Sequence, residues 1–204
     1  MTPEQSLQAE AGQKRFNASP EERLAIAAHE LGHYEMAKRA GVQPEGITIG
    51  HHPKDGRSAS VLFSSEPFDT GLTHYIDQWQ EKRQSIREAE SEQFFTSYFK
   101  TLYAGEAAED IITDRVSNSG GTDDKDARRV MINVGMFDYV IFDTESKLKR
   151  RVREELSEPE TKCKLTYAAQ QLAEHHFDGR KHLSSTIDHY LNGGTRENLP
   201  KEGQ

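Results

Sequence analysis

Two histidines, His29 and His33, stand four residues apart, and Glu30 directly follows the first of them. On a helix, residues with this spacing lie on one face with their Cβ atoms about 5–6 Å apart. Both imidazoles can then bind one Zn²⁺ ion, which takes nitrogen ligands at about 2.0–2.1 Å. Glu30 would lie beside the open coordination position, where it can accept a proton from a zinc-bound water whose pKa the metal lowers to about 7.

This His-Glu-x-x-His pattern is the signature of zinc metallopeptidases when it lies on a helix. The chain independently predicts such a helix over residues 20–40. Ser19 is a suitable N-cap, Glu22 closes a capping box, and Gly41 stands just past the last turn. Gly32 is a poor helix former, which indicates that another part of the chain packs close to the backbone there.

Composition excludes several classes of function. The formal charge is 26 − 34 = −8, which argues against a surface for nucleic acid or anionic membranes. No apolar run approaches the roughly 20 residues that span a bilayer. Residues 1–17 lack the apolar segment of a signal peptide, and the single cysteine, Cys163, allows no internal disulfide. A cytoplasmic protein is therefore expected.

The chain length fits one domain. We expect a flexible segment over residues 1–18 and a single metallopeptidase-like domain over 19–194, with C-terminal helices in 145–194. Residues 195–204 are expected to form a disordered tail. The predicted fold class is mostly α (α+β), a helical zinc-peptidase domain with a small β-hairpin or sheet after the metal-binding helix.

The hairpin is predicted from β-branched and apolar runs at residues 47–49 and 57–64, separated by turn residues. The other predicted helices span residues 73–115, 123–134, 145–156, 160–177 and 182–191.

A catalytic zinc site needs a third protein ligand, and two candidates compete. Glu106, with Asp110 four residues later, has the spacing that thermolysin-like peptidases use for a ligand and its supporting carboxylate. The alternative is the pair Asp123 and Asp124, which follows a Gly-Gly-Thr loop and begins a predicted helix. An aspartate at such a junction projects from a rigid element and can reach back to a metal.

Four segments resemble the peptidase domain of the FtsH family of ATP-dependent zinc proteases. They are His29–His33, Thr48–Ile49, Ala104–Ile112 and Gly120–Asp124. The third resembles that family's Gly-Gly-Arg-x-Ala-Glu-Glu run, and the fourth resembles its Gly-Ala-Ser-Asn-Asp motif. The match extends over about residues 20–190, although only these motifs are specific.

The resemblance implies that Asp124 is the third zinc ligand, with Asp123 as the fallback if the loop is shorter by one residue. It also implies that Glu109 supports the metal site by hydrogen bonding to a liganding histidine. The chain departs from the family in having no P-loop, no ATPase domain and no transmembrane segment, and Glu106 replaces the arginine of the third motif.

The expected function is that of a zinc-dependent endopeptidase, a hydrolase that cleaves unfolded or extended polypeptide without an ATPase of its own. Glu30 is the expected general base. The strand that contains Thr48 and Ile49, or its partner at residues 60–63, is expected to hold the substrate by strand addition. A homo-oligomer or a separate delivery partner is compatible with this interpretation.

Two rival interpretations stay open at this point. One is a thermolysin-like or repressor-cleaving cytosolic metallopeptidase with Glu106 as the third ligand. The other is a non-catalytic zinc-binding regulatory protein, against which the intact Glu30 argues. The remaining conspicuous residues receive weaker interpretations: His51 and His52 are not expected to form a second metal site, Trp79 is either a partner anchor or a core lid, and His175, His176 and His182 are expected to be solvated.

Overall fold

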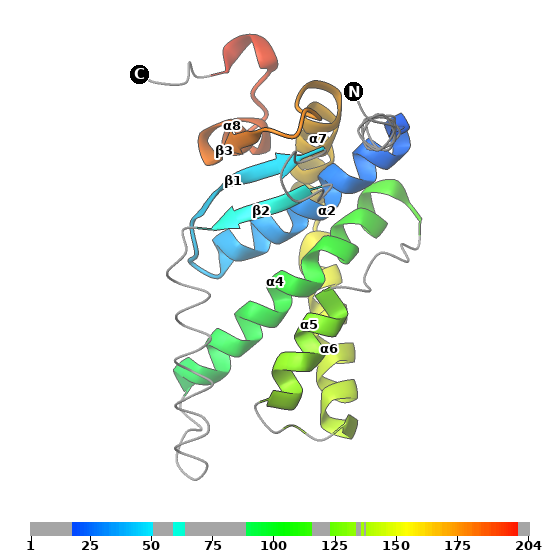
Figure 1. The fold of residues 1–204 in the computed structure, drawn as a ribbon, viewed down its shortest axis with the longest axis vertical. Coiled ribbons are helices and arrows are strands. Elements are labelled where there is room, and N and C mark those ends of the chain that lie inside the picture. Colours follow the sequence, from blue (N-terminus) through cyan, green and yellow to red (C-terminus); the bar gives the residue numbers. More distant parts are fainter. Residues whose placement is uncertain are drawn as a thin grey trace, which may run out of the picture.

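The protein is described from a computed structural model, in which most of the chain is helical and a small antiparallel sheet covers one side (Figure 1). The mostly α (α+β) fold class is therefore confirmed. The structure describes residues 18–50, 59–63, 89–115, 123–133, 136 and 138–199. The predictions for the N-terminal segment, His51, His52, Trp79 and the first part of the 73–115 helix lie outside these residues.

Helix α2 spans Pro20–Arg39, as the sequence predicts. The capping box is present: the Ser19 hydroxyl accepts the N–H of Glu22 at 3.2 Å, and the Glu22 carboxylate accepts the N–H of Ser19 at 2.7 Å. These two bonds satisfy donors that would otherwise be unpaired at the helix start. At the other end, Gly41 adopts a φ of +79°, the left-handed conformation typical of a residue just past a helix.

Helix α4, Ala89–Thr113, packs directly against α2. The two helices approach closely at Gly32, where an added Cβ would lie 2.2 Å from the Ala104 carbonyl oxygen and 2.7 Å from the Ala108 Cβ. The prediction that something packs close to Gly32 is thus confirmed. On its other side, α2 packs against α7, Pro159–His175.

Three antiparallel strands form a sheet in the order β2-β1-β3. Strands β1, Pro44–Ile49, and β2, Ala59–Phe63, form the predicted hairpin. Strand β3, Lys181–Leu183, was not predicted, and the helix expected from residue 182 begins later, as α8, Ser184–Leu191. Figure 1 shows β1 and β2 lying across α2.

Two further helices, α5 at Asp123–Asn133 and α6 at Asp138–Leu156, pack against α4. Helix α6 begins before the predicted start at residue 145. A short 3-10 helix, η1, covers Arg196–Asn198, so part of the segment that was expected to be disordered has regular structure. Within the described part of the chain, no helix is long and apolar enough to cross a membrane.

The expectation of solvated histidines near the end of α7 is wrong for two of them. His182 is 8% exposed, and its Nδ1 lies 3.1 Å from Nδ1 of His176. The outer ring nitrogens also have partners: His182 Nε2 lies 3.0 Å from Asp178, and His176 Nε2 lies 2.7 Å from the Tyr190 hydroxyl. The two rings therefore join the end of α7 to β3 and α8.

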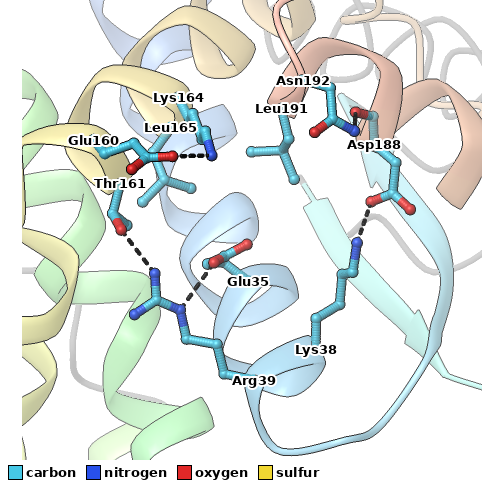
Figure 2. Close-up of a pocket in the computed structure, with 10 residues that line it drawn as sticks. All are labelled: Glu35, Lys38, Arg39, Glu160, Thr161, Lys164, Leu165, Asp188, Leu191 and Asn192. Atoms are coloured by element: carbon cyan, nitrogen blue, oxygen red, sulfur yellow. Dashed lines mark hydrogen bonds and ion pairs between the residues drawn. The ribbon is translucent and has the colours of Figure 1, made fainter.

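The side of α2 that faces α7 and α8 borders a surface hollow of about 330 Å³, whose apolar floor is Leu165 and Leu191 (Figure 2). Each basic side chain around it is paired with an acidic one: Lys38 with Asp188 at 2.6 Å, Arg39 with Glu35 at 2.9 Å, and Lys164 with Glu160 at 2.6 Å. These pairs join the end of α2 to its neighbours, because Lys38 reaches α8 and Arg39 also donates to Thr161 of α7 at 2.8 Å.

Candidate metal centre

The two histidines of the motif lie between α2 and α4, and each has one ring nitrogen held by α4. His33 donates from Nδ1 to the Thr101 carbonyl at 2.7 Å, provided that the proton is on Nδ1. His29 Nδ1 lies 3.4 Å from the Glu109 carboxylate, the contact that the resemblance implied for Glu109. Partners of this kind orient a histidine so that its other nitrogen faces a metal.

The two Nε2 atoms converge on Asp123 at the start of α5. The Asp123 Oδ2 atom lies 3.2 Å from Nε2 of His29 and 3.3 Å from Nε2 of His33. Ligand atoms held at about 2.0–2.1 Å by a tetrahedral ion lie about 3.3 Å from one another. The two distances from Asp123 match this value, and because the three ligand atoms all lie within 4.8 Å of one another, the three residues together could hold a metal ion.

Gly105 of α4 supplies the space for this site. A Cβ at this position would lie 2.4 Å from Nε2 of His33 and 2.5 Å from Nε2 of His29. Real side chains do not approach so closely, so any residue other than glycine would push the two imidazoles out of place. The lack of a side chain at Gly105 thus leaves the coordinating nitrogens open on the side of α4.

The charged groups at this site mainly shift one another's pKa values. Burial opposes a charge on His29, but hydrogen bonds to Asp123 and Glu109 and the nearby Glu30 raise the pKa of His29 to about 10. Burial also opposes a charge on Asp123, yet hydrogen bonds from His29 and His33 hold the pKa of Asp123 far below its usual range. A positive charge is therefore stabilised between the histidines, and a bound metal would supply it in place of the proton.

Glu30 is buried, with an exposed fraction of 8%. Burial raises the pKa of Glu30, while the neighbouring His33 and His29 and a backbone hydrogen bond from Val61 of β2 lower it in part. A carboxylate with a raised pKa is a better proton acceptor at neutral pH than an ordinary surface glutamate. Its position between the two histidines and the sheet suits a proton-transfer role.

The structure brings Asp123, and not Asp124, to the histidines. Asp124 points to α6, where its carboxylate accepts a hydrogen bond from Lys149 at 2.7 Å. Glu106, the thermolysin-like candidate, lies 3.5 Å from the same lysine and is absent from the group that could hold a metal. The sequence could not separate adjacent aspartates, because the choice depends on the rotation of α5 and on a lysine 25 residues away.

Thr48 and Ile49 belong to β1, the middle strand of the sheet. Thr48 pairs with β2 on one side and with Lys181 of β3 on the other. The Ile49 carbonyl accepts the N–H of Gly179 at 2.7 Å. Because both edges of β1 are occupied, these two residues have no free backbone edge to which a substrate strand could be added. Strand addition to β1 itself therefore has no free edge in the structure, while a role of Thr48 and Ile49 in substrate binding stays a prediction.

No family model matches the sequence, and no curated protein matches it either.

Proposed function

We propose that this chain is a zinc-dependent endopeptidase that hydrolyses peptide bonds in unfolded or extended polypeptide. The observation that supports the proposal most directly is the convergence of His29, His33 and Asp123, with Glu30 buried beside them. Three protein ligands and an adjacent carboxylate are the composition of a catalytic zinc site, whereas a structural site uses four protein ligands.

The donor set favours zinc over harder cations. Two imidazole nitrogens and one carboxylate oxygen suit Zn²⁺, while Mg²⁺ and Ca²⁺ prefer oxygen ligands throughout. Zinc bound at this position would polarise a peptide carbonyl and lower the pKa of a coordinated water to about 7.

In this proposal, Glu30 moves the protons. It accepts a proton from the attacking water and delivers it to the amine that leaves. The raised pKa of the Glu30 carboxyl, caused by its burial, suits a group that must both take and return a proton. The hydrogen bond from the Val61 backbone would help to orient the carboxylate.

Strand β2 replaces β1 as the proposed site of substrate alignment. It lies at one edge of the sheet, and no further strand pairs with it among the described residues. Val61 directs its N–H at Glu30, which brings this strand to the catalytic carboxylate. An extended peptide could add to that edge by main-chain hydrogen bonds, with its scissile bond near the metal.

The resemblance to the FtsH peptidase domain is retained as part of this proposal, with Asp123 in the ligand position. Action on loose or unfolded chains is likewise part of the proposal. Whether the substrate arrives through a delivery partner or a homo-oligomer is a separate property, which the proposed chemistry does not require. A cytoplasmic site of action is proposed from the cysteine usage alone.

Substitution of Glu30 by Gln tests the proposal. This change preserves the shape of the side chain but removes its basicity, so zinc should stay bound while cleavage of an unfolded, alkylated protein falls about 10²–10⁴-fold. Glu35→Gln is the matched control, because Glu35 lies on the same helix and pairs with Arg39 at 2.9 Å. A chelator should abolish wild-type activity, and undiminished cleavage by Glu30→Gln would contradict the mechanism.

A non-catalytic zinc-binding regulator is the rival from a different class. It predicts that the purified protein binds zinc but cleaves nothing, with or without Glu30. The buried Glu30 carboxylate argues against it, since removing a carboxylate from water costs stability and a structural zinc site needs no such group beside it.

A further inference from the structure

Lys149 of α6 contacts carboxylates from three helices. Its ammonium group lies 2.7 Å from Asp124 of α5, 3.2 Å from Glu145 of α6 and 3.5 Å from Glu106 of α4. One ammonium group therefore contacts three acidic side chains where these helices meet.

Lys149 is well held in this position. About a third of its side chain is exposed, and its ammonium lies 5.2 Å from the centre of the Tyr103 ring. Glu145 is 8% exposed and also accepts a bond from Arg128 at 2.9 Å. Because these carboxylates are partly removed from water, loss of the lysine would leave Glu106 and Asp124 repelling each other.

The two neighbouring aspartates at the start of α5 point to different helices. Successive residues on a helix are turned by about 100° about its axis, so one rotation of α5 cannot direct both side chains to the histidines. In the structure, Asp123 reaches His29 and His33 while Asp124 reaches Lys149. The contact with Lys149 and the contact with the histidines thus fix the same rotation of α5.

We propose that Lys149 is a positioning residue for the metal centre: by binding Asp124 it holds α5 in the rotation that makes Asp123 the third metal ligand. This inference rests on the metal site of the proposed function. Lys149 itself touches none of the three ligands, and its effect on the metal passes through Asp124 and the backbone of the first turn of α5.

The test compares the metal affinity of six variants with that of the wild type by chelator competition with Zn²⁺ and by the absorption spectrum of bound Co²⁺. Lys149→Met keeps the aliphatic stem but removes the charge, and should weaken binding about tenfold, at the low end for residues that support metal ligands. Lys149→Arg should restore most of the affinity. The control Lys147→Met removes an exposed lysine of the same helix that pairs with Asp143 at 2.6 Å, and should change nothing.

Asp124→Asn provides a second measurement that does not depend on the folding of the Lys149 variants. It should weaken binding about as much as Lys149→Met, and the double variant should be no weaker than either single one, because both changes break one contact. The Co²⁺ spectrum should change in the same variants. A general loss of stability would not change this spectrum when the variants are compared with wild type at the same fraction of folded protein.

Four outcomes decide between the possibilities. Affinity of Lys149→Met within twofold of wild type overturns the positioning role. Loss of all binding in Asp124→Asn, with binding kept in Asp123→Asn, overturns it as well, because Asp124 would then be the ligand. A wild-type protein that binds no metal overturns both this inference and the proposed function, whereas one that binds metal but cleaves nothing overturns the proposed function alone.

Discussion

The two sides of α2 carry similar numbers of charged groups, but on one side these groups form pairs and on the other carboxylates gather around two histidines. On the side facing α7 and α8, each lysine or arginine around the hollow in Figure 2 has its own carboxylate partner. On the side facing α4 and α5, the carboxylates of Glu30, Glu109 and Asp123 gather around two histidines, and the charged groups that act most strongly on one another there are these same five.

The difference shows how a binding site can be told from a structural cluster. Paired charges on the first side join three helices and leave no net charge to attract a ligand, although the hollow is sizeable. The second side has a surplus of negative charge that only a cation balances when the histidines are neutral. An unbalanced negative charge, more than the size of a hollow, therefore identifies the candidate site.

The largest effect is expected from Asp123→Asn, which removes a proposed ligand. Zinc affinity should fall by more than the roughly 100-fold typical of losing a supporting residue. Asp126→Asn is the matched control, since Asp126 also lies in the first turn of α5 but pairs with exposed Arg129 at 3.0 Å. Isothermal titration with Zn²⁺ measures both, and equal affinities would remove Asp123 from the site.

Gly105→Ala should reduce zinc affinity by at least about tenfold, because its methyl group would meet both Nε2 atoms and the histidines must turn away. The fold should survive, since the clashing groups are side chains and alanine favours a helix by about 0.5–1 kcal/mol. Gly32→Ala should instead destabilise the fold. Its methyl group meets the Ala104 backbone and should lower the free energy of unfolding by about 1–3 kcal/mol. Metal titration and thermal melts separate the two.

His176 should make stability depend on pH. Burial and the neighbouring His182 lower the pKa of His176 to about 4, against about 6.5 in an unfolded chain. The unfolded state then binds more protons between these values, so stability is complete above pH 6.5 and is lost as the pH falls towards 4.

The loss should reach about 2 kcal/mol after allowance for partial exposure. His176→Gln should flatten this part of the pH profile, measured by urea unfolding at each pH, whereas the control His189→Gln, at a half-buried histidine of α8, should not. An unchanged slope in His176→Gln would assign the acid sensitivity to other groups.

The smallest effect is expected on the paired side of α2. Lys38→Met removes the partner of Asp188, and such a partly exposed pair contributes about 0–1 kcal/mol. Zinc affinity and peptidase activity should stay at wild-type values. A large loss of activity with an unchanged melting temperature would show that the two sides of α2 are coupled, which contradicts the division drawn above.

Local signals were sufficient to predict α2 and the positions of its two histidines. The capping box of Ser19 and Glu22 and the glycine at residue 41 act within a few residues of chain, so they can be read from the sequence. The spacing of His29 and His33 likewise determines that they share a face once the helix is known.

The features that were missed depend on distant contacts. Strand β3 has only three residues and takes its conformation from pairing with β1, far earlier in the chain. The first turns of α6 expose Tyr139 and Phe142, so they lack the apolar periodicity that marks a helix. The choice between Asp123 and Asp124 depends on the packing of α5 against α4 and α6, which no local pattern specifies.

The contact between Lys38 and Asp188 joins residues 150 positions apart, and Tyr34 of the same helix also bonds Asp188, at 3.0 Å. During synthesis on the ribosome, which adds about 5–20 residues per second, α2 must wait several seconds for α7 and α8. Until then, one side of the helix that carries His29 and His33 has no partner. The side of α2 that meets α4 is therefore expected to be covered before the side that meets α7 and α8.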